Sequence, residues 1–194
     1  MKVIFLDHDG VICLSENWGS RYKKARKYMI DNGVAEHDPE MYDPKKRPVP
    51  IRFDNFDQKS VKILNQILEK SGAEIVISSD WKLFATVEEL GEYYELHGIS
   101  KKPIDRTLNM SEFDEHGGSM YEYKGWRDRM RIVEIKKYLE DHPEITHWVA
   151  IDDMNMSNDA QQGYGLDNFV HTPLSSQGIK QSGIKGKILK FLLW

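Results

Sequence analysis

Three short groups of acidic and hydroxyl residues stand out in this sequence because each follows an apolar run. They are Asp7-His8-Asp9-Gly10, Ser78-Ser79-Asp80 and Asp152-Asp153. Carboxylates that lie close together repel one another unless a cation lies among them. If the groups meet in the folded chain, they therefore predict a cation site built from four carboxylates, those of Asp7, Asp9, Asp152 and Asp153.

The carboxylates also indicate which cation and which reaction to expect. Aspartate oxygens are hard ligands of the type that Mg2+ prefers, and protein-bound Mg2+ usually keeps several waters and takes a substrate phosphate. The pattern therefore predicts Mg2+ as the cofactor and a phosphate ester as the substrate. Asp7 can then attack phosphorus and form an aspartyl-phosphate. Asp9 can protonate the leaving oxygen and later activate a water.

Other residues of these groups can bind the phosphoryl group. Gly10 lets the chain turn tightly after an apolar run, so that backbone amides can face phosphate oxygens. Ser78 offers a hydroxyl to the same phosphate, and Ser79 is the second choice. A cationic side chain must also offset the charge of the transferring group, and we expect Arg131 in this role. The alternatives nearby in the sequence are Lys124, Arg127 and Arg129.

Structural interpretations of the same residues remain open. Asp7 and Asp9 can form a polar turn after a strand, and the Asp152-Asp153 pair can cap a following helix. We interpret Asp80 as a helix N-cap and Trp81 as a packing residue. We interpret Cys13 as a small buried hydrophobe near the site and His8 as a side chain directed away from Asp7 and Asp9. Lys82 is the basic residue that follows Trp81.

The apolar runs have the lengths and compositions of buried strands, at Val3 to Leu6, Glu74 to Ser78 and His147 to Ile151. Helical patterns separate them, at Ser60 to Lys70 and Arg129 to Asp141. This alternation predicts an α/β fold, a Rossmann-like three-layer sandwich around a mainly parallel sheet. Ligands bind outside the carboxyl ends of such strands, so we expect the three polar groups to converge on one site.

The length of 194 residues suits a single domain over 1–194. Two less regular stretches, at about 14–58 and 82–128, are possible cap insertions that overhang the site. The first contains a basic helical pattern (SRYKKARKYMI), the second a helical pattern around Thr86 to His97. The closing KGKILKFLLW is apolar enough for the core, as a helix or as a strand.

Composition excludes several classes of protein. With 40% apolar and 30% charged residues the chain can build a core, and its net charge of -4 disfavours a protein that coats nucleic acid. No apolar run approaches the roughly 20 residues that span a bilayer, and Asp7 and Asp9 interrupt any signal-peptide pattern. A lone cysteine, Cys13, excludes an internal disulfide and predicts a cytoplasmic protein. The oligomeric state is left open.

The basic stretch 21–27 has two interpretations. Five cations in a helical pattern usually form a solvated face. Because Trp18, Tyr22 and Tyr28 are interleaved with them, the same stretch can instead stack bases and hold a phosphodiester backbone.

Taken together, the motifs resemble the haloacid dehalogenase-like (HAD) phosphatase superfamily. DHDGV after an apolar strand, Ser78 after IVI, a basic residue on the helix before the last strand, and IDD are similar to its four motifs, in order from Asp7 to Asp153. The resemblance implies a phosphatase or phosphotransferase, because a second Asp, Asp9, follows the nucleophile by two residues. Arg131 is favoured as the third motif because it opens an RxxEI pattern.

Longer stretches resemble one branch of that superfamily. VKILNQILEKSGAEIVISSDW, GISKKPIDRT and RIVEIKKYLEDHPEITHWVAIDD are similar to the HAD domain of Swiss Army Knife RNA repair proteins. This resemblance implies a phosphorylated nucleotide or nucleic-acid end as the substrate. The alternatives are a phosphatase for small molecules, such as 5′-nucleotides or sugar phosphates, and a HAD-fold binding protein without turnover.

Overall fold

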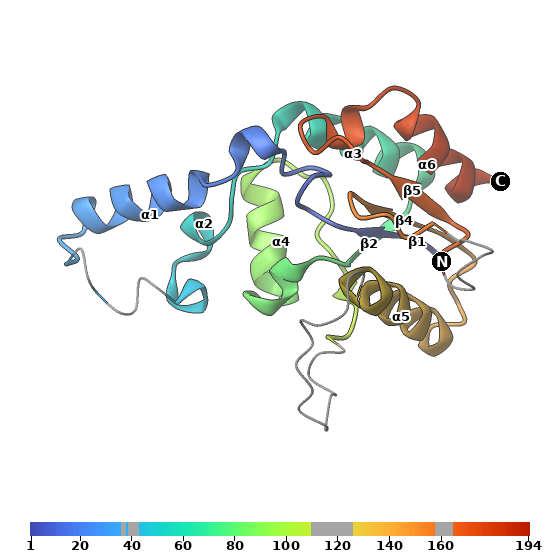
Figure 1. Ribbon diagram of the computed structural model, residues 1–194, viewed down its shortest axis with the longest axis horizontal. Helices are drawn as coiled ribbons and strands as arrows, with labels where there is room; N and C mark the ends of the chain where they lie inside the picture. The colour runs from blue at the N-terminus through green and yellow to red at the C-terminus, as the bar shows by residue number, and fades with distance from the viewer. Residues whose placement is uncertain (36–37, 39–42, 110–125, 158–164) are drawn as a thin grey trace.

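A computed structural model describes residues 1–35, 38, 43–109, 126–157 and 165–194, and of residues 126–129 the backbone alone. Its centre is a five-stranded sheet in the order β3-β2-β1-β4-β5, and every neighbouring pair is parallel (Figure 1). The strands are β1 (Lys2–Leu6), β2 (Glu74–Ile77), β3 (Asp105–Arg106), β4 (His147–Asp152) and β5 (Phe169–His171).

The three predicted strands are confirmed to within one residue at each end, as β1, β2 and β4. The two edge strands were not predicted. β3 has two residues and β5 has three, too few for an apolar period to be recognised.

The register brings the ends of the three central strands level. Leu6 at the end of β1 lies opposite Ile77 of β2 and Ile151 of β4. The ladder continues one step further, because Asp7 N donates to the Ile151 carbonyl (3.1 Å) and Ser78 N donates to the Leu6 carbonyl (3.0 Å). The polar groups that follow these strands therefore start at the same edge of the sheet.

Helices cover both faces of the sheet, which confirms the three-layer α/β architecture (Figure 1). On one face, Ile4 and Leu6 of β1 join a core cluster with α3 (Gln58–Ser71) and α6 (Ile184–Leu193). On the other face, Val3 and Phe5 pack with α5 (Trp126–Asp141). Successive side chains of a strand point to opposite faces, so β1 is buried on both. The C-terminal apolar stretch is a helix.

The helix α3 shows how the local sequence sets its own limits. The Asp57 carboxylate accepts from Ser60 N (2.8 Å) and caps the first turn, and Gly72 ends the helix in the left-handed conformation. Between them Leu64, Ile67 and other apolar residues lie on the buried face, as their spacing predicts.

The first of the two less regular stretches forms short elements beside the sheet. It contains η1 (Ser15–Asn17), α1 (Ser20–Asp31), η3 (Pro44–Lys46) and α2 (Val49–Arg52). In Figure 1, α1 extends furthest from the sheet, with α2 beside it. Whether this stretch caps the site stays a prediction.

The second stretch contributes in part to the core. It contains η4 (Asp80–Leu83), α4 (Val87–Leu96) and the strand β3. Leu90, Tyr93 and Tyr94 of α4 are fully buried in the same cluster as α3. Near the other end of the chain, the short helix η6 (Gly178–Lys180) precedes α6. Among the residues described, no helix has the length and apolar character needed to cross a membrane.

Candidate active site

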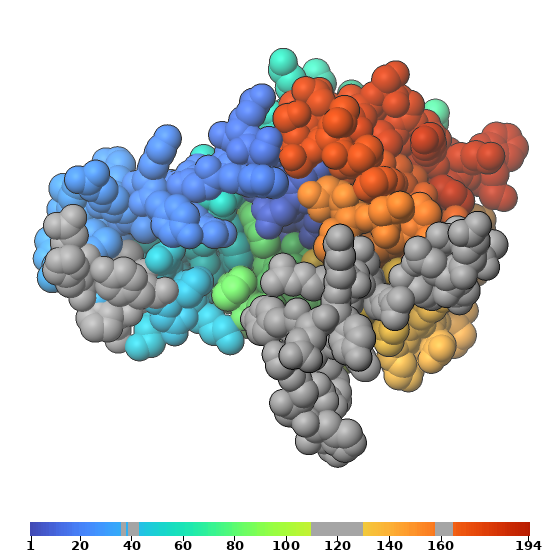
Figure 2. Space-filling view, in the orientation of Figure 1, coloured from blue at the N-terminus to red at the C-terminus, as the bar shows by residue number. Residues whose placement is uncertain are grey.

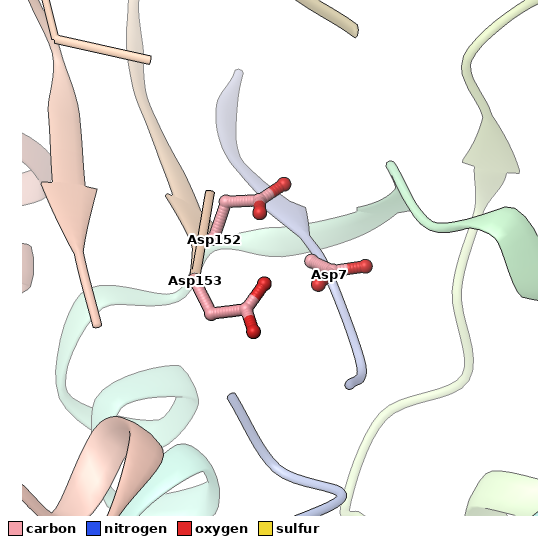
Figure 3. A group of neighbouring side chains, drawn as sticks. All are labelled: Asp7, Asp152 and Asp153. Carbon is pink, nitrogen blue, oxygen red and sulfur yellow. The ribbon is translucent and has the colours of Figure 1, made fainter. Parts of the chain in front are cut away.

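Three carboxylates meet at the carboxyl edge of the sheet. Asp7 follows β1, Asp152 ends β4 and Asp153 comes next, and one oxygen from each lies within 4.8 Å of the others (Figure 3). Asp7 and Asp152 are buried, whereas Asp153 is partly open to solvent. Two of the three sequence groups thus converge as expected, on adjacent parallel strands.

This crowding changes the affinity of the carboxylates for protons. Burial, and next the charge of Asp152, raise the pKa of Asp7 well above its usual value. The same two causes raise the pKa of Asp153 to about 6. A bound cation would offset the repulsion among these three carboxylates. The raised pKa values and the hard oxygen ligands therefore both fit Mg2+ at this position.

One guanidinium joins the cluster from α5. Arg131 Nη1 contacts Asp7 Oδ1 at 3.2 Å and Asp152 Oδ2 at 2.7 Å, and its Nη2 contacts Asp80 Oδ1 at 2.8 Å. Burial by itself lowers the pKa of Arg131, but the charges of Asp7 and Asp152 raise it above its usual value. The residue is 7% exposed, so its side chain is a buried, permanently charged group fixed by three acids.

The contact with Arg131 corrects the interpretation of Asp80. The N-cap of η4 is Ser79, whose hydroxyl accepts from Trp81 N (3.4 Å), and Asp80 is the first residue inside the turn. Asp80 therefore does not cap η4. Its carboxylate instead accepts a hydrogen bond from Nη2 of Arg131 on α5. Serine in the preceding position was an equally good cap, which sequence alone did not distinguish.

Ser78 differs from Ser79 in what its hydroxyl does. Ser78 is 2% exposed, and its Oγ has no hydrogen-bond partner within the described part of the chain. A buried hydroxyl without a partner is costly, so its presence at the end of β2 calls for a ligand. A phosphate oxygen would satisfy it.

Position 10 requires glycine because it lies very close to the side chain of Asp153. Its φ is +68°, and a Cβ built on it would lie 2.2 Å from Asp153 Oδ2. The backbone after β1 is closed tightly by three amides, those of Val11, Ile12 and Cys13, which donate to the His8 carbonyl. This turn places position 10 directly against the carboxylate of Asp153.

We expect Gly10→Ala to lose Mg2+ affinity by at least about tenfold, because the new methyl displaces the Asp153 carboxylate. The matched control is Gly72→Ala, since Gly72 has φ +69° and nothing within 4 Å of a built Cβ. Both variants carry the left-handed cost of about 1 to 2 kcal/mol, and Gly10→Ala adds the clash with Asp153, so it should unfold at least as easily as Gly72→Ala. Isothermal titration with Mg2+ compares them. Equal affinities in the two variants would show that the contact with Asp153 is unimportant.

Asp9 lies apart from the three clustered carboxylates. Its Oδ2 accepts from Trp81 Nε1 at 3.0 Å. Burial raises the pKa of Asp9, and the hydrogen bond from Trp81 opposes that rise. Trp81 is also the packing residue that was expected, because it stacks with Phe53 and Phe56 at ring-centroid distances of 4.5 and 5.3 Å. Its hydrogen bond was not foreseen, since an indole N–H has no sequence signal for its acceptor.

Lys82 is a buried structural cation. Its ammonium group donates to Glu134 of α5, to Thr107 Oγ1 (2.8 Å) and to the Leu108 carbonyl (2.9 Å). An ammonium has three donors, so all are used within the protein. The contact joins η4 and the segment after β3 to α5, three residues beyond Arg131. Only the structure reveals this network, because its members are far apart in sequence.

His171, the last residue of β5, and Thr172, which follows it, form hydrogen bonds to the backbone of the site. His171 Nε2 donates to the Asp153 carbonyl (2.9 Å), and Thr172 Oγ1 donates to the Gly10 carbonyl (3.3 Å). The stretch HTPLSSQGI, which begins with these two residues, matches family positions, but the sequence assigned neither residue a role. A strand of three residues gave no sign that its end would reach Asp153.

His8 and Cys13 take no part in the cluster. His8 is fully buried, its Nε2 shares a hydrogen bond of 2.7 Å with the Tyr94 hydroxyl, and burial followed by the charge of Arg131 lowers its pKa to about 3. Burial raises the pKa of the Cys13 thiol, which disfavours its thiolate. Of the alternative cations, Lys124 and the side chains of Arg127 and Arg129 lie outside the described residues.

A family model described as "HAD domain in Swiss Army Knife RNA repair proteins" matches residues 3–182. The matched range begins in β1 and ends beyond η6, so it includes every residue of the cluster described above. No curated protein and no solved structure gives a match to this chain. The resemblance inferred from the motifs is confirmed.

Proposed function

The chain belongs to the family of HAD domains in Swiss Army Knife RNA repair proteins, and on this premise we propose that it is a phosphomonoesterase for the terminal phosphate of a nucleotide or a nucleic acid. One observation carries the proposal. The buried carboxylate of Asp7 contacts a permanently charged guanidinium and lies beside two further carboxylates, at the edge of a parallel sheet where ligands bind.

In the proposed reaction Asp7 is the nucleophile and Asp9 handles the proton. Asp7 Oδ attacks phosphorus, the bond from phosphorus to the leaving oxygen breaks, and Asp9 gives its proton to that oxygen. The product of this half is an aspartyl-phosphate on Asp7. Asp9 then takes a proton from a water, which attacks the same phosphorus and releases inorganic phosphate. The raised pKa of Asp9 supports this role, because the group holds its proton closer to neutral pH.

Two side chains are placed to hold the oxygens of the transferring group. Arg131 offsets its negative charge, and its contacts with Asp7 and Asp152 fix the position of that charge. Ser78 can donate its unpartnered hydroxyl. The amides of Gly10, Val11, Ile12 and Cys13 already donate within the turn, so the phosphate-binding role expected of Gly10 is limited to its tight backbone. The hydroxyl of Ser79 accepts from Trp81 N as a cap.

Mg2+ fits the donor set formed by Asp7, Asp152 and Asp153, and these residues would hold it. When bound, it supplies positive charge that stabilises the charge developing on the phosphoryl oxygens. Asp9 was included among the expected ligands, but its side chain is engaged by Trp81 and is not part of the three-carboxylate group. We therefore assign its carboxylate to proton transfer.

Phosphate release from a matched panel tests the proposed function. The panel holds 3′-phosphorylated and 5′-phosphorylated oligonucleotides, free mononucleotides and sugar phosphates, each with Mg2+ and with EDTA. We expect release that needs Mg2+ and is fastest with an oligonucleotide or nucleotide. Preference for sugar phosphates would assign the protein to small-molecule hydrolysis. No release from any substrate, by folded protein that binds Mg2+, would contradict the phosphatase assignment altogether.

A further inference from the structure

Two large aromatic side chains stand in solvent directly before and inside the first turn of α1. Trp18 is 49% exposed and Tyr22 is 58% exposed. Between them Arg21 places its guanidinium over the ring of Tyr22, 5.1 Å from the centroid. These three residues, Trp18, Arg21 and Tyr22, are called the aromatic rim below.

The aromatic rim is tied to the turn that carries Asp9. Trp18 Nε1 donates to the Cys13 carbonyl (3.3 Å), and the same carbonyl accepts from Gly10 N (2.9 Å). Cys13 also forms a β-bridge with Asp9. Trp18 is therefore one hydrogen bond away from the loop that positions the general acid.

The start of α1 is anchored, so the rim has a fixed place. Asp54, which is 4% exposed, accepts from Arg21 N (2.7 Å) and from Ser20 Oγ (3.2 Å). Further along the helix, Lys24 Nζ donates to the hydroxyl of the buried Tyr93 (3.0 Å). Exposed aromatic rings on a fixed backbone lose little freedom when they stack on a ligand.

The outer face of α1 carries positive charge. Lys23 and Arg26 are exposed, and neither forms an ion pair with a carboxylate of the described residues. The one acidic residue of the helix, Asp31, is paired with Lys27 (2.8 Å). Exposed cations that have no carboxylate partner among the described residues, beside exposed rings, form the combination that holds a single-stranded backbone while its bases stack.

The position of Asp9 indicates where a substrate would lie relative to the aromatic rim. If Asp9 protonates the leaving oxygen, the leaving group lies on the Asp9 side of the phosphorus, which is the side where the rim is attached. Figure 2 shows a hollow on this face, between the blue atoms of the segment that carries α1 and the orange atoms near β4 and β5. The darkest blue atoms, from the first residues of the chain, lie at its bottom.

We propose that the aromatic rim, with Lys23 and Arg26, binds single-stranded nucleic acid whose terminal phosphate enters the site. Trp18 and Tyr22 stack on bases next to that phosphate, and the cations of α1 contact the following phosphodiesters. The inference rests on the proposed function, because the role of Asp9 as the general acid determines on which side of the phosphate the strand lies. It goes beyond that function by choosing a polymer over a free nucleotide.

Binding to the Asp7→Asn protein in EDTA tests the rim without turnover. The probes are fluorescein-labelled, phosphorylated single strands of about ten nucleotides, as RNA and as DNA, and the readout is anisotropy. We expect Tyr22→Ala and Trp18→Ala each to weaken binding by about tenfold, the usual effect of one lost stacking contact. Trp18→Phe should keep most of the affinity, because it keeps a stacking ring without the hydrogen bond to Cys13. Trp194→Ala, which removes a 95% exposed tryptophan from the end of α6, is the matched control.

The salt dependence of binding tests the cations. For single strands, each phosphate contact adds about 0.7 to the slope of log affinity against log salt concentration. We expect the Lys23→Ala, Arg26→Ala double variant to lower the slope by about 1.4. The control is the Lys187→Ala, Lys190→Ala double variant on α6, where two exposed lysines are removed far along the chain from the rim.

The outcomes separate the rim from the phosphatase assignment. Hydrolysis of p-nitrophenyl phosphate needs the site but no polymer, so it reports on the proposed function alone. If the rim variants bind oligonucleotides as tightly as Trp194→Ala does, or if the protein binds no oligonucleotide, the rim proposal is wrong even when the small ester is hydrolysed. If binding falls in the rim variants while no ester is hydrolysed, the nucleic-acid surface stands and the phosphatase assignment fails.

Discussion

Asp7→Asn should abolish phosphate release, with a loss in kcat of at least about a thousandfold. Without the carboxylate oxygen no bond to phosphorus forms, and the residues that remain only bind the substrate. The measurement is single-turnover release from the best substrate of the panel, together with acid-stable radiolabel on the protein from a labelled phosphate ester. Wild-type protein should carry transient label, and Asp7→Asn should carry none.

The same variant makes a prediction about stability that does not depend on substrate. The pKa of Asp7 is raised in the folded protein, so folding stability is lost as the pH rises and the buried group ionises. Asp7→Asn removes that ionisation. In EDTA, its melting temperature relative to wild type should therefore increase from acid toward neutral pH.

A substitution at the surface is the control for both the turnover and the stability measurement. Asp141→Asn removes a carboxylate at the end of α5 that pairs with Lys137 in solvent. It should leave turnover and the pH dependence of unfolding as in wild type. Label on Asp7→Asn, or turnover close to that of Asp141→Asn, would show that Asp7 is not the nucleophile.

Arg131→Met should cost about 3 to 5 kcal/mol of unfolding free energy in EDTA, because it leaves Asp7 and Asp152 buried without their counter-charge. Methionine replaces the unbranched stem of the lost side chain, though not its guanidinium, and its flexibility limits the effect of the cavity. Urea unfolding followed by circular dichroism gives the free energy. Added Mg2+ should restore more stability to the variant than to wild type, since the carboxylates then have no other cation.

The control for this change is Lys137→Met on the same helix. Lys137 is exposed and pairs with Asp141, and surface pairs of this kind contribute about 0 to 1 kcal/mol. If Arg131→Met unfolds as Lys137→Met does, the guanidinium does not balance the acids. Turnover gives a second comparison, because the loss of Arg131 should also reduce kcat by about a hundredfold or more.

The central strands, the main helices and the meeting of Asp7 with Asp152 and Asp153 were all predictable from sequence. Their signals are strong, because a strand buried on both faces is a continuous apolar run and parallel strands bring their polar ends to one edge. The family was recognisable for the same reason, since its motifs lie at those ends. The sequence favours Ser78 over Ser79, and in the described part of the chain the buried Ser78 hydroxyl has no hydrogen-bond partner.

The sequence did not reveal contacts between residues that are far apart in the chain, because each of these residues also has an ordinary local role. Asp80 had a good interpretation as a cap, but Ser79 takes that position and leaves Asp80 to Arg131. Trp81 had a good interpretation as a packing residue, yet it also engages Asp9. The buried network of Lys82 depends on the placement of α5 beside η4, which no local pattern specifies.

The position of β1 at the middle of the sheet has a consequence for biosynthesis. During translation β1 and Asp7 are made well before β4, which provides Asp152. The nascent domain therefore carries Asp7 before Asp152 and Asp153, its neighbours in the folded site, have been made. A chain that stops before β4 lacks Asp152 and Asp153, so it cannot form the three-carboxylate cluster.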